Sequence, residues 1–179
     1  MIRLFTAIEI PESVRFRLTL LQAGIPGARW MPAENLHLTL RFIGEVDEPT
    51  ADDIDQVLSE LRLPAFTLTL KGVGEFGGKD VRALWVGVAT NPALHRLVAK
   101  IESALQRMGL VPETRKYSPH VTIARLKDAP LTKVREFLSA NNLFDSGHFP
   151  ASAFALFSSR QTAKGRLYRV ESTYTLHPC

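Results

Sequence analysis

Residues 37–44 read HLTLRFIG, and residues 120–126 read HVTIARL. Both stretches open with a histidine, an apolar residue, a threonine and a second apolar residue. Side chains two residues apart in a β-strand point to the same face. The histidine and threonine of each stretch therefore share one face, and the apolar residues take the other. The apolar face accounts for packing against a core, so a histidine and a threonine on the other face of both strands indicate a function.

Strand and helix patterns alternate around these two stretches, and their order repeats. Residues 2–73 are predicted to run strand, helix, His-containing strand, helix, strand, and residues 82–160 run in the same order. The predicted strands are 2–10, 35–44, 65–73, 82–90, 118–126, 154–160 and 166–176. The predicted helices begin near Pro11, Thr50, Pro92 and Leu131, with Asn91 as an N-cap.

A repeated order of elements predicts two similar halves related by a pseudo-two-fold axis. Such an axis makes the two His-containing strands counterparts that face a common cleft. We therefore expect an α+β fold over residues 1–179, a single bilobal domain whose halves are roughly 1–78 and 79–179. Each half is expected to be a mostly antiparallel sheet with helices on its outer face.

The composition is typical of a soluble globular protein that needs no disulfide or metal to hold its core. Of the 179 residues, 45% are hydrophobic and 22% are charged. The single cysteine, Cys179, and the lack of a long apolar segment predict a cytoplasmic protein that does not enter membranes. A net charge of +4 favours an anionic partner. No long heptad pattern argues for a protein partner, so we expect a monomer.

Two histidines and two threonines that face each other suit displacement at a phosphorus atom. Imidazole gives or takes a proton near neutral pH, so one histidine can activate the nucleophile while the other protonates the leaving oxygen. The threonine hydroxyls can donate hydrogen bonds to the non-bridging phosphate oxygens. The spacing alone leaves open which histidine is the acid.

A metal site is the rival use of histidine, but its usual patterns are missing. The five histidines are at positions 37, 95, 120, 148 and 177, without a HExxH pair or a cysteine cluster. We therefore expect no metal and no cofactor. His95 is predicted to be a surface residue, and His148 and His177 to lie in a loop or tail. The GxGxxG match at residues 72–77 is followed by another strand and not by a helix, so it predicts a turn.

Other side chains near the two stretches extend the candidate site. Strict alternation places Arg41 on the face of the first histidine and Phe42 on the apolar face. Arg125 follows the second histidine by five residues, so it reaches the polar face only if a β-bulge interrupts the alternation. Trp30 and Phe42 flank the first stretch, and Tyr117 precedes the second. Such aromatic rings either stack on a nucleobase or form cleft wall and core, and the sequence leaves both uses open.

Four stretches together resemble one family of enzymes. They are LFTAIEIP near the start, RWMPAENLHLTLRFIGEV at 29–46, ALWVGV at 83–88 and YSPHVTIARL at 117–126. They resemble the two-histidine (2H) phosphoesterase superfamily, and within it the RNA 2′,3′-cyclic phosphodiesterases, which are also called 2′-5′ RNA ligases. The resemblance covers nearly the whole chain and implies a bilobal fold with a cleft between the lobes.

The resemblance also implies an activity and roles for the matching residues. It implies metal-independent hydrolysis of a terminal 2′,3′-cyclic phosphate on RNA to a 2′-phosphate, with reversible 2′-5′ joining as a further activity. His37 corresponds to the proton donor to the leaving 3′-oxygen, and His120 to the proton acceptor that activates water. Thr39 and Thr122 correspond to the residues that hold the phosphate oxygens. Arg125 matches a basic residue that follows the second motif.

Two alternatives stay open at this point. One is a phosphodiesterase for small cyclic nucleotides, and the other is a non-catalytic module that binds RNA. Identification of the product formed from an RNA with a cyclic phosphate end separates the binding module from the main hypothesis. Comparison of kcat/KM for a mononucleotide and an oligomer separates the enzyme for small nucleotides.

Overall fold

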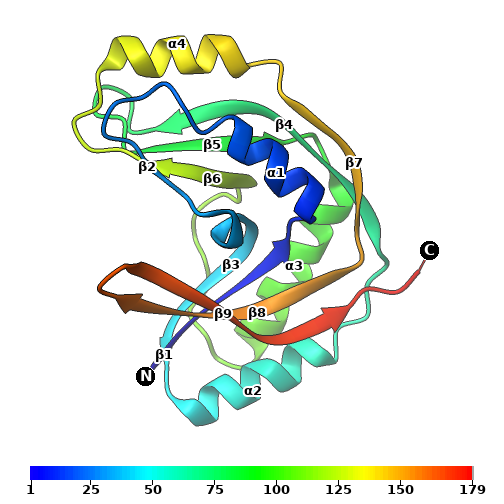
Figure 1. The fold of residues 1–179 in the computed structure, drawn as a ribbon. Coiled ribbons are helices and arrows are strands. Elements are labelled where there is room, and N and C mark those ends of the chain that lie inside the picture. The colour runs from blue at the N-terminus through cyan, green and yellow to red at the C-terminus, as the bar shows by residue number, and fades with distance from the viewer. Residues whose placement is uncertain (179) are drawn as a thin grey trace.

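The chain pairs its strands into two antiparallel sheets, one above the other in Figure 1. The computed structural model describes residues 1–178, so Cys179 lies outside the described residues. The strands are β1 (Ile2–Glu9), β2 (Arg29–Trp30), β3 (His37–Val46), β4 (Phe66–Phe76), β5 (Ala83–Val88), β6 (His120–Arg125), β7 (Asp145–Ala151), β8 (Ala153–Thr162) and β9 (Gly165–Thr175). The helices are α1 (Glu12–Leu20), α2 (Glu48–Ser59), α3 (Pro92–Arg107), α4 (Leu131–Asn141) and the short 3₁₀-helix η1 (Ala33–Asn35).

Each sheet takes strands from both halves of the sequence. The first sheet has the order β3-β1-β8-β9, and the second has the order β2-β6-β5-β4-β7. The triplets β3-β1-β8 and β6-β5-β4 correspond, because β1 and β5 open the two halves, β3 and β6 carry the histidines, and β8 and β4 close them. The closing strand of each half therefore joins the sheet that the other half opens. The predicted α+β class with two pseudo-symmetric lobes is confirmed, and the lobes are interlocked.

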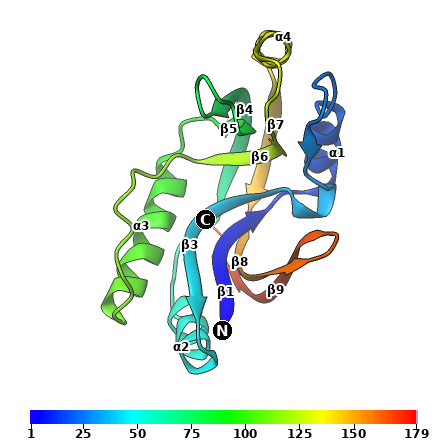
Figure 2. The same cartoon turned by 90° about the vertical axis from the view of Figure 1, so that its left-hand side faces the viewer.

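The helices cover the faces of the sheets that point away from the cleft. α3 packs on β3, α2 packs on β1 and β9, and α4 packs on β4. Figure 2 shows α3 and α2 flanking β3 and β1. One continuous apolar core runs through both lobes. No helix within residues 1–178 has the length and hydrophobicity needed to cross a membrane.

The helix starts follow the expected capping chemistry. The Asn91 side-chain oxygen accepts a hydrogen bond of 3.0 Å from the Leu94 N–H at the start of α3, as predicted. The Asp47 carboxylate accepts one of 2.9 Å from the Thr50 N–H, so α2 begins slightly before the predicted start. These caps define where the helices leave the sheets.

Two strands, the two-residue β2 and the longer β7, were missing from the prediction, and one histidine was placed wrongly. β7 occupies a segment predicted to be a loop, and it places His148 on a strand. Gly147 and Pro150 are poor strand formers, so the sequence signal is weak, and pairing with β4 overrides it. The GxGxxG segment, predicted to be a turn, is mostly the end of β4, and the turn into β5 begins only at Gly77; as predicted, no helix follows it. Gly74 is required there because a Cβ would lie 2.1 Å from the Trp85 ring.

Candidate active site

The first histidine stands on the inner face of the first sheet, inside a set of aromatic rings. The His37 ring centroid lies 4.9 Å from that of Phe5, 5.8 Å from that of Phe157 and 5.2 Å from that of Tyr168. Phe5 and Phe157 are buried, and each comes from a different strand of the sheet. These three residues, which we call the aromatic wall, shield one side of the imidazole, and His37 remains partly exposed.

The aromatic wall changes the acidity of His37. Burial lowers the pKa of His37 from 6.5 to about 4, and a hydrogen bond with the backbone of Asn35 partly opposes this shift. The imidazole is therefore neutral at pH 7 in the free protein. A bound phosphate anion favours the charged imidazolium and so raises this pKa again.

The lowered pKa of His37 makes a testable difference to stability. Between pH 6.5 and about 4 the unfolded chain carries a proton on His37 that the folded chain does not. Stability conferred by this difference is present above pH 6.5 and is lost as the pH falls to about 4, up to about 3 kcal/mol. In urea unfolding, wild type should lose about that much more stability over this range than His37→Phe. His177→Phe, a change at an exposed histidine, should keep the wild-type dependence, and equal slopes for wild type and His37→Phe would contradict the shift.

The second histidine is oriented by the backbone just before it. His120 Nδ1 lies 2.7 Å from the carbonyl oxygen of Ser118. A carbonyl oxygen only accepts, so Nδ1 carries the hydrogen and Nε2 keeps the free lone pair of the neutral ring. Phe76 meets the ring edge-on at 4.9 Å, and Trp85 lies at 6.3 Å. Both histidines thus bond to the backbone two residues earlier and stand beside aromatic rings.

A β-bulge follows the first motif and exchanges the places of two candidate residues. Thr39 pairs with Ala7 but Arg41 pairs with Thr6, so β3 has one extra residue at this point. Arg41 therefore turns to the helix-covered face, where it is 8% exposed. Phe42 pairs with Phe5 and joins the face of the histidine, where it is 39% exposed. The faces predicted for Arg41 and Phe42 were wrong because strict alternation cannot anticipate a bulge.

A second bulge occupies the equivalent place in the second motif. Thr122 pairs with Trp85 but Ala124 pairs with the preceding Leu84, so β6 also has one extra residue. Arg125 consequently returns to the face of Thr122. This is the interruption that the sequence required before Arg125 could join the site. Phe42 and Arg125 both follow their histidine by five residues, so the two motifs match beyond their four residues.

Arg41 is used inside the structure. Its guanidinium forms an ion pair with Glu102 of α3 and donates a 2.8 Å hydrogen bond to the carbonyl of Val111. Burial pushes the pKa of Glu102 up, but hydrogen bonds from Arg41, Gln106 and the Glu113 N–H outweigh this and hold it below its usual value. Arg41 therefore joins β3 to α3 and to the segment that leads to the second motif. Because its guanidinium is used in these contacts, we no longer assign Arg41 a contact with the substrate.

Two aromatic candidates have structural contacts. Trp30 pairs with Ala124 and packs on Phe137 of α4 at 6.0 Å, on the face away from the histidines. The Tyr117 hydroxyl donates a 2.9 Å hydrogen bond to the backbone carbonyl of Thr39, and burial raises the pKa of Tyr117 above its usual value. Tyr117 thus connects the segment before His120 directly to the first motif.

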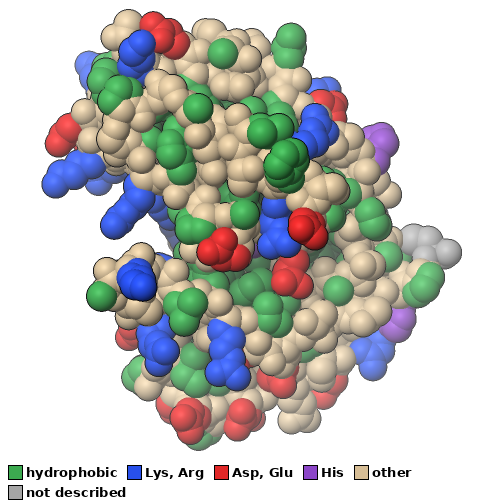
Figure 3. Space-filling model, viewed as in Figure 1, with side chains coloured by type: hydrophobic (Ala, Val, Ile, Leu, Met, Phe, Trp, Pro, Cys, Tyr) green, Lys and Arg blue, Asp and Glu red, His purple; other side chains and the backbone are tan. Residues whose placement is uncertain are grey.

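The two motif strands lie close to each other where the lobes meet. β3 contacts β6, although they belong to different sheets. Figure 3 shows a hollow between the lobes, with basic side chains above and below its opening. Within residues 1–178 no three His, Cys, Asp or Glu side chains form a group that could hold a metal ion.

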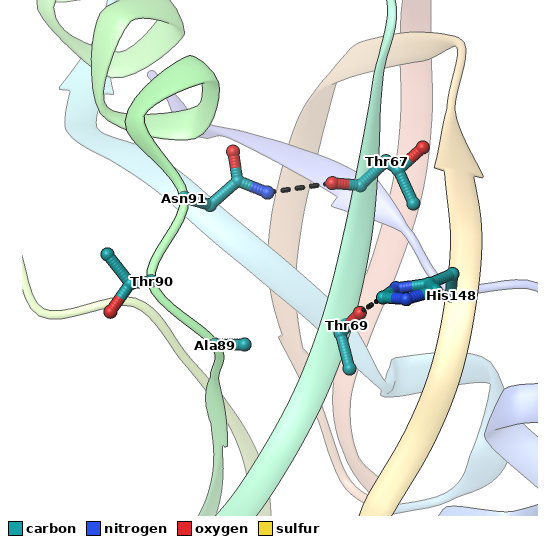
Figure 4. Close-up of a pocket in the computed structure, with 6 residues that line it drawn as sticks. All are labelled: Thr67, Thr69, Ala89, Thr90, Asn91 and His148. Carbon is teal, nitrogen blue, oxygen red and sulfur yellow. Dashed lines mark hydrogen bonds between the residues drawn. The ribbon is translucent and has the colours of Figure 1, made fainter.

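A separate groove of about 430 Å³ contains none of the motif residues. It lies between β4, β7 and the start of α3 (Figure 4). His148 Nδ1 lies 2.6 Å from the Thr69 hydroxyl, and the Asn91 amide donates a 2.7 Å hydrogen bond to the Thr67 carbonyl. His148 and Asn91 in the groove thus already bond to neighbouring groups, and the strand faces that carry His37 and His120 are the better candidate for chemistry.

Comparison with known proteins identifies the family. The family model described as the 2′-5′ RNA ligase superfamily matches residues 12–163. This chain belongs to that superfamily. It is 36% identical to the RNA 2′,3′-cyclic phosphodiesterase of Aeropyrum pernix over 87% of this chain and 89% of the relative. It is 33% identical to the protein of the same name from Methanocaldococcus jannaschii over 94% of this chain and 97% of the relative.

A solved structure has the same fold over nearly its full length. The crystal structure of E. coli LigT complexed with 3′-AMP superposes with a TM-score of 0.80 and 28% identity, covering 98% of both chains. The match over nearly the full length agrees with the interlocked arrangement of the lobes.

Several residues around the histidines were missed from the sequence. They are Phe5, Phe157 and Tyr168 around His37, Phe76 and Trp85 around His120, and Arg29 opposite Arg125. Alternation in each strand shows that these residues share a face, but it does not show which strands are neighbours. The exchange of closing strands between the sheets brings Phe157 of β8 and Phe76 of β4 to the site.

Proposed function

We propose that this chain is an RNA 2′,3′-cyclic phosphodiesterase, which hydrolyses a terminal cyclic phosphate to a 2′-phosphate. The observation that carries the proposal is the pair of matching motif strands. Each carries a backbone-oriented histidine and a threonine on one face, and an equivalent bulge brings Arg125 to that face of the second strand. Relatives of that name over nearly the whole chain, and a similar structure that binds 3′-AMP, support the choice of a nucleotide end.

The proposed reaction moves two protons through the two histidines. His120 Nε2 takes a proton from water as its oxygen attacks phosphorus, and His37 gives a proton to the departing 3′-oxygen. The P–O3′ bond breaks, and the products are a 2′-phosphate and a 3′-hydroxyl. Thr39, Thr122 and Arg125 stabilise the charge on the non-bridging oxygens. The direction of proton movement follows the family assignment.

The low pKa of His37 fits this order of events. The free site holds His37 neutral, so the proton that it donates must enter with the substrate or after it. The phosphate anion supplies the charge that stabilises the imidazolium. The acid is thus charged only when an anion occupies the cleft.

The decisive experiment identifies the product. An oligoribonucleotide ending in a 2′,3′-cyclic phosphate, incubated with the protein and a chelator, should yield an end that carries only a 2′-phosphate. A 3′-phosphate would show that the 2′-oxygen leaves and that the assignment of the acid is wrong. Binding without turnover would support the RNA-binding module.

Joining follows from the same chemistry run with a different nucleophile. If the 5′-hydroxyl of a second RNA replaces water, attack on the cyclic phosphate expels the 3′-oxygen and forms a 2′-5′ linkage. Hydrolysis is favoured over joining because water is far more abundant than the 5′-hydroxyl of a second RNA. The single cysteine suits a reducing compartment, so we propose that the enzyme acts on cytoplasmic RNA. The sequence has no long heptad pattern, so we propose that it acts as a monomer.

A further inference from the structure

We infer that Arg29 binds the internucleotide phosphate that lies next to the reacting end of the RNA, and that Arg125, which stabilises the reacting phosphate, also contacts this second one. The inference rests on the proposed function and adds a second phosphate site to it. Arg29 of β2 stands directly opposite Arg125 of β6. Both side chains are exposed, and both belong to the face that carries His120.

The two neighbouring positive charges of Arg29 and Arg125 repel each other unless an anion binds between them. Like charges directly opposite each other on neighbouring strands destabilise a sheet. No carboxylate within residues 1–178 forms an ion pair with either arginine, whereas Arg41, Arg82 and Arg115 each have one. Two guanidinium groups side by side match the geometry of a phosphate, to which arginine donates paired hydrogen bonds.

The short strand β2 is held in place firmly enough to position Arg29. Trp30, the next residue, packs on Phe137 at 6.0 Å on the far side of the sheet. The Met31 N–H donates a 2.9 Å hydrogen bond to the Ile123 carbonyl. The Gln22 amide bridges the same two residues, at 2.8 Å from the Met31 carbonyl and 3.1 Å from that of Ile123. These contacts hold a two-residue strand whose outward side chain is Arg29.

The position of Arg29 favours a second phosphate over the reacting one. Thr122 pairs with Trp85 and Arg125 with Ala83, so the bulge leaves them only about two regular residues apart, or about 7 Å along the sheet. Arg29 is displaced from Arg125 by one further strand spacing, about 4.8 Å. Arg125 therefore lies between Thr122 and Arg29 on the surface of the sheet. The row from Thr122 to Arg29 can follow an RNA backbone away from its cyclic end.

The test compares two substrates that differ by this phosphate. A cyclic mononucleotide has only the reacting phosphate, whereas a dinucleotide with a cyclic end has one more. Arg29→Gln should lower kcat/KM for the dinucleotide about tenfold more than for the cyclic mononucleotide. It should also reduce the slope of log affinity against log salt by about one for the dinucleotide. Arg29→Lys should restore part of the difference.

A matched control removes the same charge elsewhere on the same lobe. Arg135→Gln, on exposed α4, should leave the ratio of the two substrates at its wild-type value. Equal losses on both substrates, or no loss on the dinucleotide, would overturn the inference. If wild type hydrolyses neither substrate, the proposed function fails. The inference is then judged by calorimetry with a dinucleotide and a mononucleotide that each end in a 3′-phosphate, where Arg29→Gln should weaken only dinucleotide binding.

Discussion

Replacement of His37 or His120 by alanine is expected to lower kcat for a cyclic phosphate end by at least about 100-fold, because each change removes one of the two proton transfers. Single-turnover assays of product formation measure the chemical step directly. Combining the two changes should cost much less than the product of the single losses, because the two groups act in one concerted step.

Three observations make the result specific. His177→Ala should retain wild-type activity, since that histidine is exposed and outside the cleft. Thermal unfolding should show that the His120 variant is folded, because its side chain is only partly buried. Full activity in either cleft variant would exclude paired acid–base catalysis, whatever the result for binding.

Glu102→Ala is expected to destabilise the protein by about 3 kcal/mol, because it leaves the buried Arg41 guanidinium without its charge partner. Denaturant unfolding measures the loss. Among the ion pairs of the described residues, loss of this one should lower the stability most, because its two side chains are mostly buried, at 9% and 19% exposure.

Two further variants separate charge burial from packing. Glu136→Ala breaks the exposed pair with Lys133 and should change stability by less than about 1 kcal/mol. The double variant Arg41→Met with Glu102→Leu should recover much of the loss, since it removes both charges together. A single Glu102→Ala variant as stable as wild type would show that Arg41 finds another partner or reaches water.

The sequence predicts the polar face of each motif strand because alternation is a local property. His37 and Thr39, and likewise His120 and Thr122, are two residues apart within an unbroken part of their strands. Strict alternation fails immediately afterwards, at Arg41 and Phe42, because a bulge depends on how the neighbouring strand pairs. For Arg125 the sequence shows only that a bulge is needed to bring it to the histidine face, and it does not show that the bulge is present.

Residues that are brought together from distant parts of the chain could not be predicted from the sequence, for a different reason. The order of elements predicts two matching halves, but it does not show that β4 and β8 change sheets. The aromatic wall around His37 depends on that exchange, because Phe157 belongs to β8 and lies beside Phe5 only through the pairing of β8 with β1. Trp30 likewise borders the first motif in sequence, yet its face is decided by the pairing of β2 with β6.

The interlocked strands also restrict how the cleft can move. The chain passes between the two sheets four times, after β1, β2, β3 and β7. Two lobes joined by one linker open by bending at that linker, whereas lobes joined at four points need coordinated changes in every connection. The separation of the two imidazoles is therefore set when the protein folds. We therefore expect an RNA end to enter a cleft of nearly constant width, with little closing of the lobes around it.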